Sequence, residues 1–240
     1  MNDSYLAIDI GTGSIKAAEK SPDGEILRWG ILERRGRPFH ANIQPLSAED
    51  AVKHLRVLLD RMRKQGPLTA SEVVASVPSF AVFTAFAPEA DARYIPAAAG
   101  TFELASIKLG EGWNFLYAAP RDLIEKYTRI FSGIGLSLSR LELENVVLAK
   151  SLVGVPERVL LVDVGYRSSS FTVAENGLPI FVDRVDFAVA SGEKSEATRG
   201  YVRDVIMNKT KEIAANWAVG RIVSTGGPKG AFDIVAGLYL

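Results

Sequence analysis

The amino-acid sequence predicts an α/β protein in which one strand-rich unit occurs twice. Short apolar runs alternate with segments of helical periodicity along the 240 residues. An apolar run that ends in Asp-x-Gly occurs at Asp9 and again at Asp163, each time followed by two further predicted strands. The composition is that of a globular chain, with 48% hydrophobic and 23% charged residues. A chain of this length can bury a large core, either as one α/β domain or as two small lobes.

Composition and charge exclude several classes of protein. The 28 basic residues balance the 28 acidic ones, which removes the electrostatic case for nucleic-acid binding. The absence of cysteine excludes disulfides and thiolate metal sites. The only histidines, His40 and His54, are too few for a metal centre built from histidines. The first residues carry no signal-peptide pattern, and no run of 18 apolar residues occurs. We expect a cytoplasmic protein that reaches a membrane only through a partner.

The first copy of the repeat begins the chain as a three-stranded meander. We expect strands at Tyr5–Ile10, Ser14–Lys20 and Glu25–Leu32. The last two are joined by a turn, Ser21–Gly24, in which proline and glycine occupy the positions that turn geometry favours.

A capped helix and a further strand follow. Ser47 is the expected N-cap, with Asp50 as its capping-box partner, and Gly66 with Pro67 ends the helix. The helix is predicted from the apolar stripe Ala51, Val52, Leu55, Leu58, Leu59 and Met62, and a strand is expected at Glu72–Val77.

Residues 79–119 read as a small inserted unit of strands. Pro120 then opens a helix at its first turn. The expected inserted strands are Ala81–Phe86, Phe102–Leu109 and Asn114–Ala119, and after the helix come a strand at Leu136–Leu143 and a short helix at Glu144–Val153.

The second copy of the repeat has the same order of elements as the first. A strand ends at Asp163-Val164-Gly165, a second strand spans Phe171–Glu175, and Asn176-Gly177 is a hairpin turn before a third strand at Leu178–Phe181. A helix at Ser195–Trp217, a strand at Arg221–Thr225 and a helix at Ala231–Leu240 complete the chain. We therefore expect a first lobe at 1–155, with an inserted subdomain at about 79–142, and a reduced second lobe at 156–240.

The repeated turns carry the chemistry expected of a phosphate-binding site. Backbone N–H groups in such turns can hold phosphate oxygens, and Gly11 and Gly13 allow close approach. Thr12 and Ser14 add hydroxyl donors, and Lys16 can neutralise phosphate charge. The carboxylates of Asp9 and Asp163 at the two strand ends can hold a hydrated Mg²⁺. The plainer interpretation is that both aspartates cap turns and that the lysine is solvated.

These motifs resemble those of the actin, Hsp70 and sugar-kinase superfamily. Asp9–Lys16 is similar to its first phosphate motif, Asp163–Gly165 to its second, and Ser224–Gly227 to its adenosine motif. Within that superfamily the Ser14–Ala17 run, the segment Ala118–Tyr127 and the position of the inserted unit look most like the PilM family of type IV pilus assembly proteins, which is related to FtsA. The resemblance implies a duplicated ribonuclease-H-like (actin-like ATPase) fold with a small inserted α+β subdomain.

The resemblance also implies ligands and partners. It implies ATP with Mg²⁺, the cytoplasmic N-terminal peptide of a PilN-like inner-membrane pilus protein, and self-association as a further option. The peptide would lie in a groove beside the inserted subdomain, where Phe80, Phe83 and Phe86 are candidate contacts, and a role in the core is the equal alternative for these three residues. Glu144, with Asn145 beside it, lies near the place where the family carries a polar residue close to the γ-phosphate, and is the candidate catalytic residue. The nucleotide-binding candidates are Asp9, Gly11, Thr12, Gly13, Ser14, Lys16, Asp163, Gly165, Ser168, Gly226 and Gly227, with Asp9 and Asp163 also as metal ligands.

One departure from the family pattern keeps other interpretations open. The family carries an extra subdomain between the second phosphate motif and the adenosine motif, whereas Phe187–Thr225 has room for little more than one helix. We therefore expect at most a weak ATPase. The alternatives are an FtsA-like division protein, which needs a C-terminal membrane helix, and a nucleotide-free interaction module. A small-molecule kinase would need a catalytic aspartate and a substrate lobe, and neither is visible in the sequence.

Overall fold

The structure is a computed structural model that describes residues 4–11, 13–33, 47–96, 98, 100–166, 168–186 and 196–226. These residues form two compact units. The first unit comprises Met1–Thr84, Ala92–Ala105 and Tyr117–Leu143, and the second comprises Ala85–Asp91, Ser106–Leu116 and Glu144–Leu240. The predicted helix at Ala231–Leu240 lies outside the described residues.

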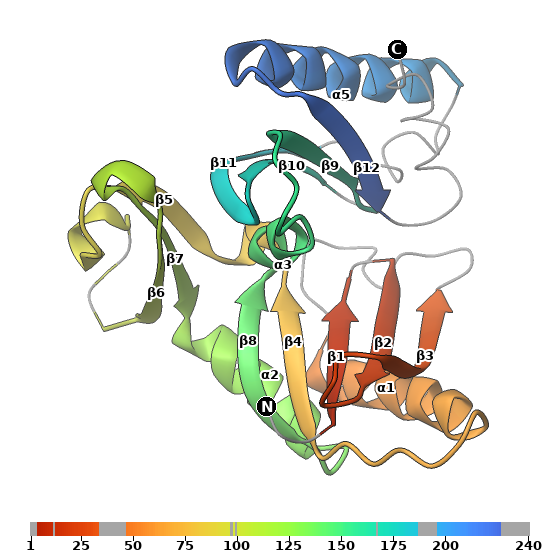
Figure 1. Ribbon diagram of the computed structural model, residues 1–240. Coiled ribbons are helices and arrows are strands. Elements are labelled where there is room, and N and C mark those ends of the chain that lie inside the picture. The colour runs from red at the N-terminus through yellow and green to blue at the C-terminus, as the bar shows by residue number, and fades with distance from the viewer. Residues whose placement is uncertain are drawn as a thin grey trace. The chain divides into compact units, whose positions relative to one another are not determined.

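The first unit is built on a five-stranded sheet with the order β3-β2-β1-β4-β8 (Figure 1). The first three strands form the predicted antiparallel meander, and β4 and β8 extend the sheet in parallel with β1. The strands are β1 (Tyr5–Ile10), β2 (Ser14–Lys20), β3 (Ile26–Glu33), β4 (Glu72–Val77) and β8 (Ser137–Leu143), and each predicted boundary is confirmed to within one residue.

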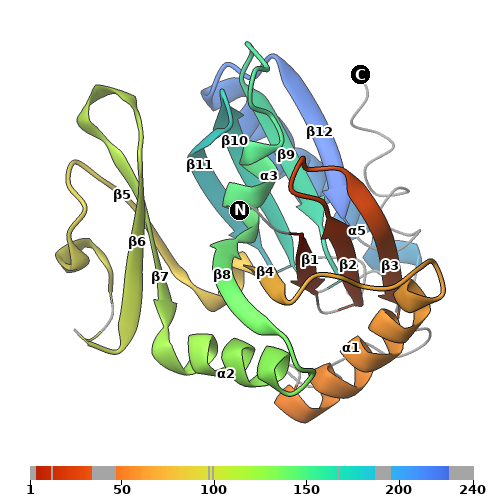
Figure 2. The ribbon, with the colours of Figure 1, turned by 60° about the horizontal axis from the view of Figure 1, so that its bottom comes forward.

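Two helices pack on one face of this sheet, α1 (Ala48–Arg63) and α2 (Arg121–Ser132) (Figure 2). The predicted cap of α1 is confirmed, because the Ser47 Oγ accepts a hydrogen bond of 3.1 Å from the Asp50 N–H. Five of the six stripe residues of α1 are buried, namely Ala51, Leu55, Leu58, Leu59 and Met62. Gly30 on β3 faces this helix, and a Cβ there would lie 2.8 Å from Leu58, so glycine sets how closely the two elements pack.

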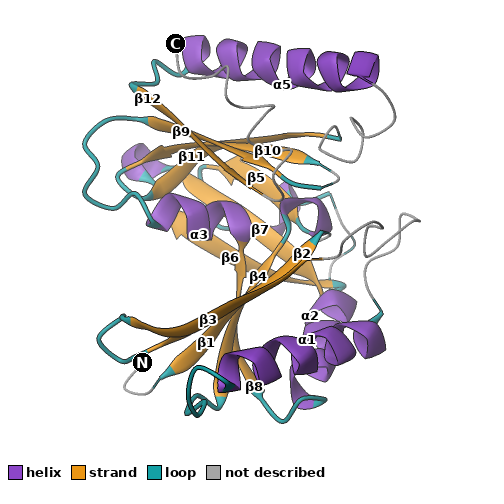
Figure 3. Ribbon diagram, turned by 90° about the vertical axis from the view of Figure 1, so that its right-hand side faces the viewer, coloured by secondary structure: helices purple, strands orange, loops and turns teal. Residues whose placement is uncertain are grey.

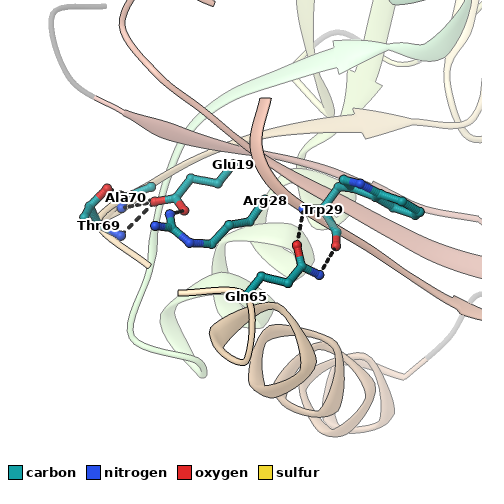
Figure 4. A network of polar contacts seen from close by, with 6 residues as sticks. All are labelled: Glu19, Arg28, Trp29, Gln65, Thr69 and Ala70. Atoms are coloured by element: carbon teal, nitrogen blue, oxygen red, sulfur yellow. Dashed lines mark hydrogen bonds and ion pairs between the residues drawn. The ribbon is translucent and has the colours of Figure 1, made fainter. Parts of the chain in front are cut away.

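A buried carboxylate ties β2 to β3 and to the segment that leads into β4 (Figure 4). Glu19 is fully buried, and its Oε1 accepts from the Thr69 N–H at 2.7 Å, the Thr69 hydroxyl at 2.9 Å and the Ala70 N–H at 3.0 Å. Its Oε2 forms an ion pair with Arg28. Because a buried charge needs partners, this network fixes three chain segments at once.

The second unit contains a four-stranded sheet with the order β11-β10-β9-β12 (Figure 3). One face packs against α5 (Glu196–Asn216) through Val202, Ile206 and Ile213. The other face packs against α3 (Glu144–Lys150) through Ala149. The strands are β9 (Val159–Val164), β10 (Ser169–Glu175), β11 (Leu178–Val185) and β12 (Arg221–Gly226).

The two sheets share one topology, which confirms the internal repeat. In each, the second strand lies antiparallel between the third and the first, and a later strand adds in parallel to the first, so that β3-β2-β1-β4 corresponds to β11-β10-β9-β12. Asp9 and Asp163 occupy the same place in the two registers, one residue before the end of the first strand.

The predicted inserted unit is a three-stranded sheet with the order β5-β7-β6. Its strands are β5 (Phe83–Ala87), β6 (Phe102–Lys108) and β7 (Asn114–Pro120), and its 3-10 helices are η1 (Ser79–Ala81), η2 (Ala92–Tyr94) and η3 (Gly110–Gly112). Four predicted ends differ from the structure by two residues or more. The strand β10 begins at Ser169 instead of Phe171 and β11 ends at Val185 instead of Phe181, because the two strands stay paired as far as Ser169 and Val185. The strand β5 begins two residues later than expected, because η1 occupies its start. The helix α3 ends at Lys150 instead of Val153, because Ser151–Gly154 forms turns in which Gly154 has a φ of 84°.

Candidate functional site

Asp9 is held between hydroxyl and ammonium groups on the two neighbouring strands. In the register it lies opposite Lys16 on β2 and Ser76 on β4. Its Oδ2 pairs with the Lys16 Nζ at 3.1 Å, and its Oδ1 accepts from the Ser76 hydroxyl at 2.8 Å. Both charged side chains remain partly exposed, at 38% for Asp9 and 44% for Lys16. The end of β1 therefore holds the Asp9 carboxylate and the Lys16 ammonium together, both partly open to solvent.

In the turn after β1, the first glycine, Gly11, makes the hydrogen bond that closes the turn. The Gly11 N–H donates to the Ser14 carbonyl at 3.0 Å, so it is engaged within the turn and not directed at a ligand. A Cβ at Gly11 would lie 3.1 Å from that same carbonyl oxygen, which explains the glycine sterically. Ser14 is buried, with 8% of its surface exposed, so its hydroxyl is largely covered. Gly13 is half-buried beside it, and Thr12 lies outside the described residues.

The turn after β9 repeats this geometry. The Gly165 N–H donates to the Ser168 carbonyl at 3.1 Å, and a Cβ at Gly165 would lie 2.9 Å from the same oxygen. Asp163 lies in register with Ser170 on β10 and with Thr225 on β12. In both units the aspartate therefore has polar residues on both sides, and in both the turn glycine closes its own loop.

The predicted adenosine motif begins at the end of β12. Gly226 pairs with Val164 and has a φ of +129°, a backbone conformation that favours glycine. A Cβ there would come within 2.8 Å of the backbone nitrogen and carbonyl carbon of Val164. The strand end thus contacts the residue just before the second phosphate turn. Gly227 lies outside the described residues.

A buried polar cluster joins the start of α3 to β10. Asn145 is fully buried and donates from Nδ2 to the Thr172 hydroxyl at 2.6 Å. Among the described residues, neither the buried Asn145 Oδ1 nor the buried Ser170 Oγ has a hydrogen-bond partner. Buried polar atoms are usually paired, so each of these two oxygens could accept a hydrogen bond from a water or a polar ligand atom.

Glu144, the predicted catalytic residue, is the half-buried first residue of α3. Because Asn145 is tied to Thr172, the sheet fixes the helix turn that carries Glu144.

Sequence reasoning missed Ser76, Ser170 and Thr172. The signal that could have found Ser76 is its place next to last in the strand Glu72–Val77, because parallel neighbours end at the same edge of a sheet. Asp9 is likewise next to last in β1, at that same edge, and the two side chains are hydrogen-bonded.

Within the described residues no group of three or more histidine or acidic side chains could hold a metal ion. Mg²⁺ is usually held by one or two carboxylates together with water and phosphate, so Asp9 fits a nucleotide-bound magnesium better than a protein-only metal centre. Among the described helices, none combines the length and apolar character needed to cross a membrane.

Comparison with known proteins identifies the fold. No protein-family model matches the chain, and no curated protein matches it in sequence. A solved structure described as the PilM-PilN type IV pilus biogenesis complex is similar over 99% of this chain and 85% of its own, with a TM-score of 0.73 and 14% identity. A Bacteroides thetaiotaomicron protein described as having an actin-like ATPase fold is similar over 99% of this chain and 87% of its own, with a TM-score of 0.54 and 7% identity. The chain has the actin-like ATPase fold.

A third solved structure is also similar to this chain. The ethanolamine utilization protein EutJ from Carboxydothermus hydrogenoformans covers 92% of this chain, which covers 76% of EutJ, with a TM-score of 0.57 and 14% identity.

Proposed function

We propose that this chain is a PilM-like cytoplasmic scaffold of a type IV pilus inner-membrane platform. In this proposal it binds a short cytoplasmic peptide of a PilN-like membrane protein, and that partner keeps it at the inner membrane. The observation that carries the proposal is the similarity to the PilM-PilN structure, whose TM-score of 0.73 over 99% of this chain exceeds the 0.57 of EutJ.

The proposal includes ATP and Mg²⁺ as ligands of the repeated turns. Asp9 supports it, because its two oxygens are already oriented by Lys16 and Ser76 and remain partly exposed. Bound Mg²⁺ would neutralise phosphate charge. The Asp9 carboxylate would hold a water of the hydrated ion, and the Lys16 ammonium would exchange its carboxylate partner for a phosphate oxygen.

The second turn would bind phosphate in the same way through Asp163, Gly165 and Ser168, while Gly226 and Gly227 would lie against the adenosine. The N–H groups of Gly11 and Gly165 close their own turns, so phosphate would be held by the later N–H groups of each turn, at Gly13 and Ser14 in the first. Glu144 would orient a water in at most a weak ATPase.

ATP titration by calorimetry in the presence of Mg²⁺ tests the nucleotide site. Asp9→Ala should weaken ATP binding by about tenfold or more, because it removes a charged group that orients the cation. Asp23→Ala is the matched control, since Asp23 is an exposed aspartate in the turn between β2 and β3. Equal affinities of the two variants would remove Asp9 from the site. Absence of binding to the wild type would leave a nucleotide-free interaction module.

The partner is tested separately with a synthetic peptide of the N-terminal cytoplasmic segment of the PilN-like protein from the same organism. Calorimetry should give a saturable 1:1 isotherm with the full chain, and a scrambled peptide should give none. A wild-type chain that binds neither peptide would contradict the scaffold proposal, whatever the result with ATP.

A further inference from the structure

An aromatic pocket lies within the second compact unit, and none of its described lining residues belongs to either aspartate turn. Its volume of about 540 Å³ falls within the range of about 300–1,000 Å³ that is usual for small-molecule sites. One wall comes from the inserted unit and carries Phe86 and Trp113, and the other carries Phe181 of β11 and Trp217, the residue after α5. We propose that this pocket binds a neutral, planar heterocycle with a lactam edge, in which a ring N–H lies beside a ring C=O.

The aromatic walls are fixed by packing before a ligand arrives. The rings of Phe181 and Trp217 lie 5.1 Å apart, and the ring of Phe86 lies 5.0 Å from that of buried Phe115. A preformed site loses little conformational freedom on binding. Aromatic side chains stack on flat rings, and every heterocyclic base has such a face. The walls therefore favour a planar ligand.

Trp113 is an accessible part of the lining. It is 49% exposed although its side chain is large and apolar. A tight turn fixes its backbone, because its carbonyl accepts from the Leu109 N–H at 2.7 Å and its own N–H donates to the Gly110 carbonyl at 3.3 Å. A ring that stacks on Trp113 would remove this apolar surface from water, which favours binding.

An ion pair forms the polar part of the lining. The Arg158 Nε donates to the Glu175 Oε1 at 2.9 Å, and the Arg158 Nη1 donates to the Trp217 carbonyl at 3.4 Å. Within the part of the chain that the structure describes, these bonds leave the Arg158 Nη2 and the Glu175 Oε2 open, and the two side chains are 40% and 46% exposed. The pair therefore offers a ligand one donor and one acceptor from neighbouring side chains.

This donor and acceptor match a lactam edge. The Glu175 Oε2 would accept from the ring N–H, and the Arg158 Nη2 would donate to the ring C=O. Because the opposite charges of the pair cancel, a phosphate or carboxylate gains no net attraction here. A ring without polar edge atoms would cover both groups and leave them without hydrogen bonds, which costs binding energy. The lactam edge occurs in hypoxanthine, guanine and uracil, so bases of this kind are the ligand class.

Inosine, a nucleoside that has a lactam edge and no phosphate, is the probe. Tryptophan fluorescence reports its binding, because two of the three tryptophans line the pocket and the third, Trp29, lies in the first unit. In a Trp29→Phe protein, inosine should change the emission saturably. In 1-methylinosine the ring N–H is blocked, so about tenfold more of it or above should be needed. Equal affinities for the two nucleosides would show that the lactam edge is not recognised.

Matched variants test the aromatic wall. Trp113→Ala should weaken inosine binding about tenfold or more, because it removes a stacking surface. Phe80 and Phe83, which the sequence suggested as peptide contacts, are 39% and 38% exposed and lie outside the described lining. Phe80→Ala is therefore the control and should change the affinity by less than about twofold. Thermal melts check that both variants are folded, and Trp113→Phe should recover part of the affinity.

A second pair of variants tests the polar part. Glu175→Gln should weaken inosine binding about tenfold, because a neutral amide replaces the carboxylate that accepts from the ring N–H. Glu196→Gln changes an exposed residue of α5 outside the described lining and should have no effect. Excess MgATP should not displace inosine. Displacement by MgATP, full affinity in Trp113→Ala, or no inosine binding to the wild type would each overturn the proposal. None of these results bears on the scaffold function, which is tested with the partner peptide.

Discussion

At the scale of single residues, Glu19 makes the first unit sensitive to acid. Burial raises the pKa of the Glu19 carboxyl, but hydrogen bonds from Thr69, Arg28 and Ala70 outweigh it, so its pKa lies below the ordinary value of 4.5. The unfolded chain therefore binds a proton to Glu19 at higher pH than the folded chain does. The stability that this carboxylate contributes is complete above pH 4.5 and is lost as the pH falls through the folded-state pKa.

Urea denaturation between about pH 7 and pH 3 measures this contribution. Glu19→Gln should be less stable than the wild type at neutral pH, since Arg28 then loses its buried ionic partner. Its free energy of unfolding should also fall less steeply in acid. Glu125→Gln, at an exposed position on α2, should keep the wild-type slope. Parallel pH profiles for all three proteins would contradict the prediction.

The Asn145–Thr172 hydrogen bond is a second residue-scale test. Thr172→Val keeps the side-chain shape but leaves the buried Asn145 Nδ2 without its acceptor, which should cost about 1–3 kcal/mol of stability. Thr172→Ser keeps the hydroxyl and loses a methyl group, for which about 0.8 kcal/mol is expected. Denaturant titration compares the two. A valine variant as stable as the serine variant would show that the hydroxyl is dispensable.

At the scale of elements, the end of β12 depends on glycine. Gly226→Ala combines a φ of +129° with contact against the Val164 backbone, so a cost of about 2–4 kcal/mol is expected. Gly24→Ala is the control, because Gly24 has a φ of 87° but nothing within 4 Å of a Cβ, and it should show only the backbone strain. If thermal denaturation shows the same loss of stability for both variants, the close contact between the new Cβ and Val164 adds no cost of its own.

The edge of β3 shows how an element is kept from pairing with other chains. Gln65 mimics a neighbouring strand, since its Oε1 accepts from the Trp29 N–H at 3.3 Å and its Nε2 donates to the Trp29 carbonyl at 2.8 Å (Figure 4). Trp29 is 59% exposed, so an open edge there would favour aggregation. The side-chain amide occupies backbone groups that another strand would otherwise bind.

At the scale of the whole molecule, the sequence predicted the elements and the duplication because both depend on local patterns. Period-two apolar runs, Asn176-Gly177 and the Ser47 cap each act over a few residues, and the structure confirms them. The partners of Asp9 and Asn145 depend on strand order and register instead. Ser76 is 67 residues from Asp9, and only the parallel pairing of β1 with β4 brings them together. The aromatic pocket in the second unit, lined among others by Phe86, Trp113 and Trp217, likewise collects residues from distant segments.

The duplication leads to a prediction about the molecule as a unit. A ligand that binds only the folded protein stabilises it by RT ln(1 + [L]/Kd), which is about 2.7 kcal/mol at a hundred times Kd. MgATP should therefore raise the melting temperature of the wild type. If one nucleotide uses both copies of the repeat, Asp9→Ala and Asp163→Ala should each remove most of the shift, and the double variant should add little to either.

The melting-temperature shifts of the variants show whether one nucleotide contacts both copies of the repeat or only one of them. Substitutions that act on the same ligand are strongly non-additive, whereas independent sites add. An intact shift in Asp163→Ala together with its loss in Asp9→Ala would assign the nucleotide to the first copy alone. The second aspartate would then be a strand residue, flanked in register by Ser170 and Thr225, that repeats the position of Asp9 without its ligand.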